Sequence, residues 1–274
     1  MKDLRGTTAI VTGASRGIGV YIARALAQEG ANLSLAARSE GELEQVRAEM
    51  EALGVTAIAT VCDVADGADR ARLLERTEAE LGPIDILVNN AGIERFRRFE
   101  ESPEVDFTDT LAINLEAPIL LTRAVVPGML ERRRGHVVNI ASAGGKVGAA
   151  YAASYCASKH GLVGFTNALR AEYEKSPVGF SVVCPGFVTD TGMYNRWETK
   201  GVHAPLIAGT SKPEKVASVT IDCIRKNRSE VTVNTPPVRP LIVFANLLPA
   251  LTPLLLRVTG YTKTCARIAT IAVD

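Results

Sequence analysis

The octapeptide TGASRGIG, residues 12–19, follows a short apolar stretch and opens a helical pattern over residues 17–29. Its glycines, Gly13, Gly17 and Gly19, allow a tight turn and a close approach of the backbone to a ligand. The free N–H groups at the start of a helix favour a pyrophosphate. Because strand, glycine loop and helix follow one another here, the pattern predicts dinucleotide binding rather than an ordinary turn.

Short apolar runs alternate with helical patterns along most of the chain. The predicted strands are residues 8–12, 31–37, 55–61, 84–90, 135–141, 178–184 and 230–233. The predicted helices are residues 17–29, 40–53, 67–81, about 103–133, 152–174 and 212–227, the last with Ser211 as its N-cap. Strict alternation implies right-handed crossovers and a parallel sheet that is covered on both faces. The sequence therefore predicts a doubly wound α/β fold.

The composition changes at TPPVRP, where a tail rich in leucine, isoleucine and alanine begins. We therefore divide the chain into a dinucleotide-binding catalytic domain, residues 1–236, and a hydrophobic C-terminal extension, residues 237–274. No residue between Arg239 and Arg257 is charged, but this stretch is at the short limit for a spanning helix and two prolines interrupt it. Three interpretations stay open: peripheral attachment to a membrane, a homodimer or homotetramer contact, and a lid over an apolar pocket. We favour peripheral attachment.

Charge and composition argue against several classes of function. The formal net charge is +1, which offers no electrostatic surface for nucleic acid. The five cysteines form no C-x-x-C pair and the three histidines show no metal-ligand spacing, so we predict reduced core cysteines and no metal site. The N-terminus lacks the pattern of a signal peptide, and we expect a cytoplasmic protein.

The end of the second predicted strand indicates which dinucleotide binds. A carboxylate at this position would bind the ribose hydroxyls of NAD and repel the additional phosphate of NADP. This sequence instead has Ala37 followed by Arg38, with Arg16 inside the glycine loop. Guanidinium groups bind phosphate in a bidentate manner, so we predict NADP(H). The alternative is that Arg38 only begins the solvated face of the next helix.

Two further segments follow predicted strands at the same edge of the sheet. Asp63 follows the third strand, where it either accepts a hydrogen bond from the adenine amino group or caps the next helix. The sequence NNAG, residues 89–92, ends the fourth strand, and its glycine allows the cofactor to approach the backbone. Both segments are expected to border the cofactor cleft.

From residue 5 to about residue 235 the sequence resembles the short-chain dehydrogenase/reductase family. The motifs that carry the resemblance are TGASRGIG, NNAG, Asn114 in AINLEA, Ser142 in NIASAGG, YCASK at 155–159 and PG at 185–186. The resemblance implies a Rossmann-like sheet of about seven strands, a nicotinamide cofactor and the catalytic set Asn114, Ser142, Tyr155 and Lys159. The residues predicted to bind the cofactor are Gly13, Ser15, Arg16, Gly17, Ile18, Gly19, Arg38, Asp63, Val64, Asn90, Ala91, Gly92, Tyr155, Lys159, Pro185, Gly186, Val188 and Thr189.

The chemistry of carbonyl reduction supports the catalytic assignment. A carbonyl that receives a hydride needs a proton donor, and free tyrosine, with a pKa of about 10, is poorly matched to this task. We expect the Lys159 cation, one helical turn from Tyr155, to lower the pKa of the phenol. Ser142 is expected to hydrogen-bond the substrate oxygen, and Asn114 to hold a water that passes protons to Lys159.

Four residues are predicted to line the substrate pocket: Gly144, Tyr151, Met193 and Trp197. Tyr151 lies four residues before Tyr155 and would share its helix face, with plain packing as the alternative. In the family a threonine usually follows the PG pair by four residues and binds the nicotinamide amide. Asp190 holds that position here, and of the two flanking threonines we assign the role to Thr189.

The function predicted from the sequence is an NADP(H)-dependent oxidoreductase that interconverts a hydrophobic ketone and a secondary alcohol. Its partner is a small carbonyl or alcohol substrate. Two alternatives stay open. One is an epimerase or dehydratase on the same scaffold, which would show no net turnover of cofactor, and the other is a non-catalytic dinucleotide sensor.

Overall fold

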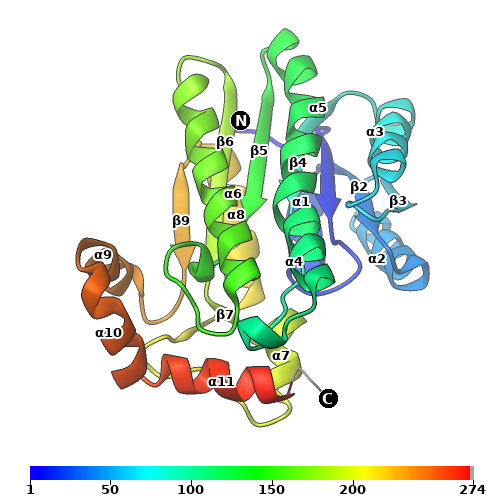
Figure 1. Cartoon of the computed structure of the whole chain (residues 1–274). Coiled ribbons are helices and arrows are strands. Elements are labelled where there is room, and N and C mark those ends of the chain that lie inside the picture. Colours follow the sequence, from blue (N-terminus) through cyan, green and yellow to red (C-terminus); the bar gives the residue numbers. More distant parts are fainter. Residues whose placement is uncertain (272–274) are drawn as a thin grey trace.

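The computed structural model describes residues 1–271, and it contains a sheet of seven parallel strands in the order β3-β2-β1-β4-β5-β6-β9 (Figure 1). These strands are β1 (Thr8–Thr12), β2 (Asn32–Ala37), β3 (Ala57–Val61), β4 (Ile84–Asn89), β5 (Gly135–Ile140), β6 (Val178–Pro185) and β9 (Glu230–Val233). The strand order reverses between β1 and β4, which is where ligands bind in open α/β sheets. The predicted Rossmann-like fold is confirmed.

Helices cover both faces of the sheet. One face packs against α1 (Ile18–Gln28), α2 (Glu40–Ala52) and α8 (Pro213–Lys226). The other packs against α3 (Gly67–Leu81), α5 (Ala117–Glu131) and α6 (Ala153–Glu172). Because both faces are covered, β1, β5 and β6 are buried along their whole length, including polar residues such as His136, Asn139 and Ser181.

The predicted long helix over about 103–133 consists of three parts. These are α4 (Glu104–Leu111), a π-helical turn η2 (Ala112–Glu116) and α5. Such π-turns inside α-helices occur frequently at functional sites, and this one contains Asn114. By length and composition the helix Glu104–Glu131 could cross a membrane. However, α5 buries Leu121 and Met129 in the core beside the sheet, as a core helix does.

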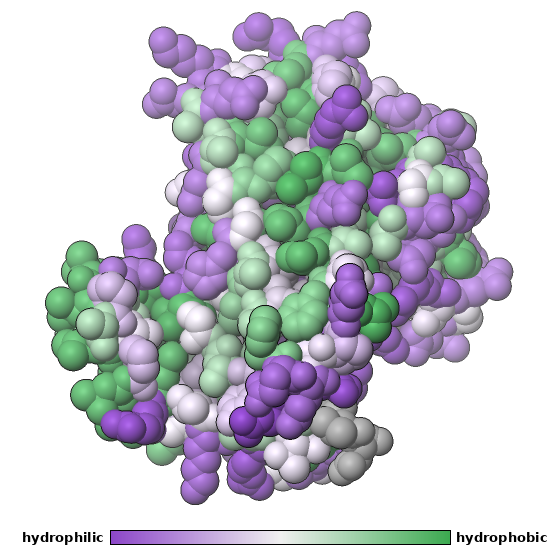
Figure 2. Space-filling view, viewed as in Figure 1, coloured by the Kyte–Doolittle hydropathy of each residue, from purple (hydrophilic) through white to green (hydrophobic). Residues whose placement is uncertain are grey.

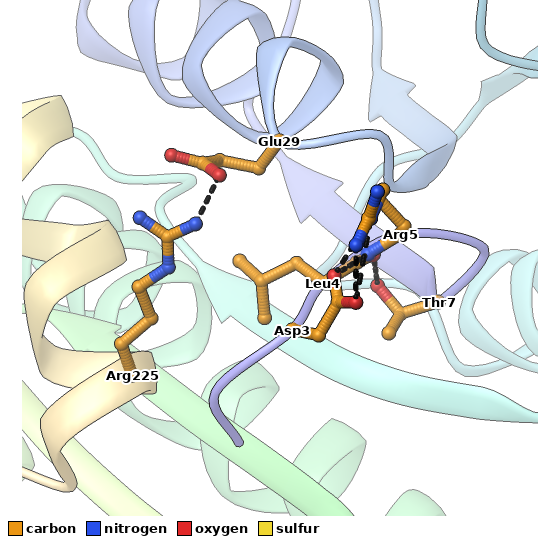
Figure 3. A network of polar contacts seen from close by, with 6 residues as sticks. All are labelled: Asp3, Leu4, Arg5, Thr7, Glu29 and Arg225. Carbon is orange, nitrogen blue, oxygen red and sulfur yellow. Dashed lines mark hydrogen bonds and ion pairs between the residues drawn. The ribbon is translucent and has the colours of Figure 1, made fainter.

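Figure 3 shows an ion pair between two helices and, beside it, a set of polar contacts within the N-terminal segment. Glu29 at the end of α1 forms an ion pair with Arg225 of α8. The Thr7 hydroxyl donates to the Leu4 carbonyl at 2.7 Å. The start of α8 differs from the prediction in one detail. Its N-cap is Lys212, because Ser211 lies in a short strand β8 (Thr210–Ser211), which pairs with β7 (Phe187–Val188).

The remaining elements surround the carboxyl ends of the strands. They are η1 (Phe99–Glu101), η3 (Ala143–Gly145), α7 (Gly192–Glu198), α9 (Arg239–Leu247), η4 (Pro249–Leu251), α10 (Thr252–Val258) and α11 (Tyr261–Ile271). In Figure 1 the last four elements, coloured orange to red, run below the carboxyl end of the sheet. The segment Pro249–Val258 is bent by 110° from α9.

The C-terminal extension shares a core with the rest of the chain. Cys265 and Ile268 of α11 are 0% exposed and belong to the same buried cluster as Phe96, Tyr194 and Trp197. The described part of the predicted extension, residues 237–271, is therefore packed on the body of the protein. The last three residues of that prediction lie outside the described residues.

Candidate active site

A cleft of about 670 Å³ opens at the carboxyl ends of the strands. Its walls come from the β1–α1 loop, the ends of β2 to β6, the first turn of α6, α7 and the C-terminal helices. Most of the residues predicted to bind the cofactor line it. These are Gly13, Ser15, Arg16, Gly17, Ile18, Arg38, Asp63, Val64, Asn90, Ala91, Gly92, Tyr155, Lys159, Pro185, Gly186 and Val188.

The glycine loop is held against the end of β4 by hydrogen bonds. Asn90 donates from Nδ2 to the Thr12 carbonyl at 2.9 Å and to the Gly13 carbonyl at 3.1 Å. Gly13 has φ +65°, and a Cβ at this position would lie 2.8 Å from the Ala91 Cα. The N-cap of α1 is Gly17, which has no side chain to cap the first N–H groups. This cradle of free backbone donors fits a pyrophosphate.

Gly19 does not line the cleft, contrary to the prediction. It is buried in the first turn of α1, where a Cβ would collide with the Gly13 carbonyl and the Asn90 amide. Its contribution is the close packing of helix on loop, because only a glycine fits between these groups.

The two predicted phosphate ligands lie at the edge of the cleft. Arg16 and Arg38 are both exposed, and Arg38 is 3.9 Å from the Asp63 carboxylate. The Asp63 carboxylate accepts from the Ala65 N–H, while the N-cap of α3 is Asp66, which accepts from Ala68 and Asp69. The alternative that Asp63 caps α3 is therefore wrong.

Lys159 is buried beneath the cleft. Its side chain is on α6, and Nζ donates to the Ile140 carbonyl at 2.9 Å while lying 5.8 Å from the centre of the Tyr155 ring. Burial lowers the pKa of Lys159 to about 8. The lysine is therefore able to take up and release a proton near neutral pH.

Ser142 and Tyr155 meet over Gly144. A Cβ at Gly144 would lie 3.3 Å from Tyr155 Cε1 and 3.5 Å from Ser142 Oγ, so both side chains border the same small space. The Gly144 N–H donates to Ser142 Oγ at 3.0 Å, which orients the hydroxyl. The arrangement can hold one carbonyl oxygen between two hydroxyl groups.

The pKa of Tyr155 differs from the prediction. Burial raises it above the ordinary value for a tyrosine, the Glu94 carboxyl adds to this effect, and Ser142 acts in the opposite direction. Burial disfavours the charged phenolate and outweighs the expected effect of Lys159. The phenol therefore keeps its proton over the neutral range.

Asn114 is fully buried and does not line the cleft. Its Nδ2 donates to the Ile93 carbonyl and its Oδ1 accepts from the Ile93 N–H, both at 2.8 Å. Leaving either backbone group unpaired would cost about 1–3 kcal/mol. Asn114 therefore fixes the chain after the NNAG segment, a role that the sequence did not reveal. The proposed water at this residue stays a prediction.

Of the four predicted pocket residues, Gly144, Met193 and Trp197 line the cleft and Tyr151 does not. The reason is that α6 begins at Ala153, so Tyr151 precedes the helix and does not share its face with Tyr155. Tyr151 has φ +66°, its carbonyl accepts from the Arg97 N–H, and its ring packs with the cluster around Trp197.

The assignment of Thr189 is also corrected. Its hydroxyl donates to Asp190 Oδ2 at 3.0 Å and it does not line the cleft, whereas Thr191 does. Thr191 is the N-cap of α7 and is therefore the better candidate to contact a bound amide.

Several cleft residues were not named individually from the sequence. Glu94 follows the NNAG segment by two residues, and Tyr261 lies in α11. Leu241, Ile242, Leu255 and Leu256 come from α9 and α10. The apolar composition of the extension was visible, but its position over the cleft depends on contacts between residues far apart in the sequence.

Residues 7–201 match the sequence profile of the short chain dehydrogenase family, and the chain belongs to this family. The ketoacyl reductase HetN of Nostoc sp. is 43% identical over 238 residues, which cover 87% of this chain and 82% of HetN. The 3-oxoacyl-(acyl-carrier-protein) reductase FabG of Escherichia coli is 37% identical over 186 residues, which cover 68% of this chain and 75% of FabG.

A solved structure of a related protein has the same fold. The crystal structure of an actinorhodin polyketide ketoreductase with NADPH matches with a TM-score of 0.78 and 34% identity. The match covers 85% of this chain and 98% of that chain.

Proposed function

We propose that this protein is an NADPH-dependent ketoreductase that reduces the 3-oxo group of a hydrophobic acyl chain to a 3-hydroxy group. The observation that carries the proposal is the convergence of Ser142, Tyr155 and Lys159 at one end of a cleft whose other end holds the glycine loop and Arg38. The ketoacyl reductases among the relatives support the choice of a 3-oxoacyl substrate.

In the proposed reaction, each catalytic residue of the cleft has a separate role. When bound, NADPH supplies a hydride for the carbonyl carbon. The Ser142 hydroxyl donates a hydrogen bond to the carbonyl oxygen, and the Tyr155 hydroxyl gives its proton to the same oxygen. Lys159, with a pKa of about 8, restores the proton on Tyr155. Burial keeps the Tyr155 phenol protonated before the reaction begins, as a proton donor for reduction must be.

The cofactor preference rests on Arg16 and Arg38, which line the cleft where a phosphate on the adenosine ribose would lie. The end of β2 offers no carboxylate to bind ribose hydroxyls, since Ala37 holds that position. The solved ketoreductase with NADPH supports the same preference.

An apolar wall supports a hydrophobic substrate. Leu241, Ile242 and Leu255 line the cleft from the C-terminal helices. A second hollow of about 850 Å³ lies between α10 and residues 146–150, and Val147, Ala245 and Leu256 line both spaces. These shared side chains give a long acyl chain an apolar path away from the catalytic end. The extension thus serves as the wall of an apolar pocket.

We also propose that the outer face of α9 and α10 attaches the protein peripherally to an anionic membrane, from the cytoplasmic side. Figure 2 shows hydrophobic side chains gathered over this corner of the molecule. Leu247 and Val258 are 73% and 69% exposed there. The sequence has no acidic residue between Glu230 and Asp274, whereas Arg239, Arg257, Lys263 and Arg267 are exposed cations. Apolar side chains bordered by cations fit an anionic bilayer.

Point variants are the better test of the attachment. Removal of the C-terminal extension would also remove α11, which contributes to a buried cluster. The double change Leu247→Gln, Val258→Gln is expected to weaken binding to anionic vesicles at least about tenfold, since two exposed apolar side chains no longer enter the bilayer. The matched control is Leu53→Gln, at an exposed leucine after α2 on the opposite side of the molecule (Figure 1). Sedimentation with vesicles measures binding, and the molecular mass in solution is measured in parallel. The wild type could instead form dimers and not bind vesicles. If the double change then disrupted these dimers, this face would be a subunit contact.

The proposed activity is tested by following NADPH oxidation with 3-oxoacyl thioesters of increasing chain length. We expect turnover that depends on substrate, with kcat/KM rising as the chain lengthens into the apolar path. If no 3-oxoacyl thioester of any chain length supported NADPH oxidation, the proposal would be contradicted.

A further inference from the structure

Glu94 lies in the catalytic end of the cleft without a role in the reaction described above. It follows Ile93, whose N–H and C=O are both bonded to the Asn114 amide, so the backbone at this point is fixed. Its side chain lines the cleft together with Tyr155 and Trp197. The position of this carboxyl is therefore set by the same hydrogen bonds that order the chain after the NNAG segment.

The Glu94 side chain is half-buried, and one of its carboxyl oxygens has no partner. Its Oε1 atom is inaccessible to solvent and has no hydrogen-bond partner among residues 1–271. Arg196 and Lys159 are the cations that act on the carboxyl, but within residues 1–271 neither donates to the Oε1 atom. A buried polar atom without a partner costs about 1–3 kcal/mol, and such atoms in native proteins call for an explanation such as a ligand.

The protonation state of Glu94 makes it a hydrogen-bond donor. Burial raises its pKa to about 8, against the opposing effects of Arg196 and Lys159. The other groups that face it are the Tyr155 phenol on α6 and the Tyr261 phenol on α11, and Arg95 lines the cleft from its own segment. At neutral pH the side chain is mainly a neutral carboxylic acid, which has one O–H to donate.

We propose that Glu94 is a specificity-determining residue whose carboxylic acid donates a hydrogen bond to the second carbonyl oxygen of a 3-oxoacyl substrate. This inference rests on the proposed function. A 3-oxoacyl thioester carries two acceptor oxygens separated by one methylene group, and the cleft offers two sets of donors. Ser142 and Tyr155 hold the ketone oxygen, and Glu94 takes the thioester oxygen. A simple ketone leaves the Glu94 carboxyl without a partner and is therefore disfavoured.

The experiment compares kcat/KM for a 3-oxoacyl thioester with kcat/KM for a monoketone of equal length, with NADPH as the cofactor. In Glu94→Leu we expect the ratio of the two values to fall about 10- to 100-fold, since the donor is lost. Glu94→Gln has nearly the same shape and keeps an N–H donor, so it is expected to restore most of the ratio. Glu101→Leu, at an exposed glutamate of the same loop, is the matched control and is expected to keep the wild-type ratio.

The pH dependence provides a readout that a merely structural role would not change. The ratio in the wild type is expected to fall as the pH rises through about 8, because the ionised carboxylate no longer donates. In Glu94→Gln the ratio is expected to stay level over the same range. An unchanged ratio in Glu94→Leu, or a wild-type ratio that rises with pH, would overturn the inference alone. A wild type that reduces neither compound would overturn the proposed function and this inference together.

Discussion

Replacing Tyr155 by phenylalanine is expected to lower kcat for ketone reduction about 100- to 10,000-fold, which is the usual contribution of a positioned proton donor. The ring is retained, so the Kd for NADPH is expected to change little. The Tyr155 phenol and the Ser142 hydroxyl border the same space at Gly144, and in the proposed reaction the phenol gives the proton. Single-turnover kinetics together with a fluorescence titration of NADPH separate the two quantities.

Tyr151→Phe is the matched control for this experiment. The Tyr151 phenol does not line the cleft, and its hydrogen bond with the Arg97 N–H uses the backbone carbonyl, so the variant is expected to keep a kcat close to that of the wild type. A result in which Tyr155→Phe stays active while Tyr151→Phe does not would show that the wrong tyrosine has been assigned to catalysis.

The second large effect is expected from the double change Ala37→Asp, Arg38→Ala. The change removes the guanidinium that we propose binds phosphate, and it introduces a carboxylate at the end of β2 that would bind ribose hydroxyls and repel phosphate. A hydrogen bond to a charged group contributes about 1.5–3 kcal/mol, and both parts of the change act in the same direction. We expect the ratio of kcat/KM for NADPH to that for NADH to fall about 100- to 10,000-fold.

Initial-rate kinetics with each cofactor measure this ratio. The matched control is Arg123→Ala, at an exposed arginine of α5 that does not line the cleft. It is expected to leave the ratio unchanged. A wild type that uses NADPH and NADH equally well would already contradict the role of Arg16 and Arg38.

The sheet could be predicted from the sequence, and so could the segments that bring the glycine loop, Ser142, Tyr155 and Lys159 to one cleft. These features depend on short segments whose local chemistry is distinctive. The glycine loop needs a backbone conformation with positive φ, as found at Gly13 and Gly17, and most of the seven strands are short apolar runs that alternate with helical patterns. The predicted strands 8–12 and 230–233 match β1 and β9 in the structure.

Predictions that depended on the exact start of a helix were less successful. The placement of Tyr151 on the face of Tyr155 needed the helix to include residue 151, one residue before its predicted start, but α6 begins at Ala153. In the same way, Ser211 was predicted as the cap of α8, whereas its hydroxyl donates to the Val233 carbonyl. Tertiary pairing of two short strands outweighed the local capping preference.

Long-range packing explains the remaining differences. The position of α9 to α11 over the cleft and the burial of Glu94 follow from contacts between segments more than 100 residues apart. The raised pKa of Tyr155 is also a result of long-range packing, because the burial that raises this pKa depends on the complete fold. The spacing along the helix identified Lys159 as a neighbour of Tyr155, but it could not predict how strongly the Tyr155 phenol is desolvated.

Transfer of deuterium tests the central claim of hydride transfer most directly. The purified protein is incubated with a long-chain 3-oxoacyl thioester and with NADPH that carries deuterium at the transferable position of C4, and the product is analysed by mass spectrometry. We predict a 3-hydroxyacyl product with one deuterium on the carbinol carbon and one NADPH consumed for each alcohol formed. A product without deuterium, or conversion of substrate with no net consumption of NADPH, would contradict this account and favour an epimerase or dehydratase.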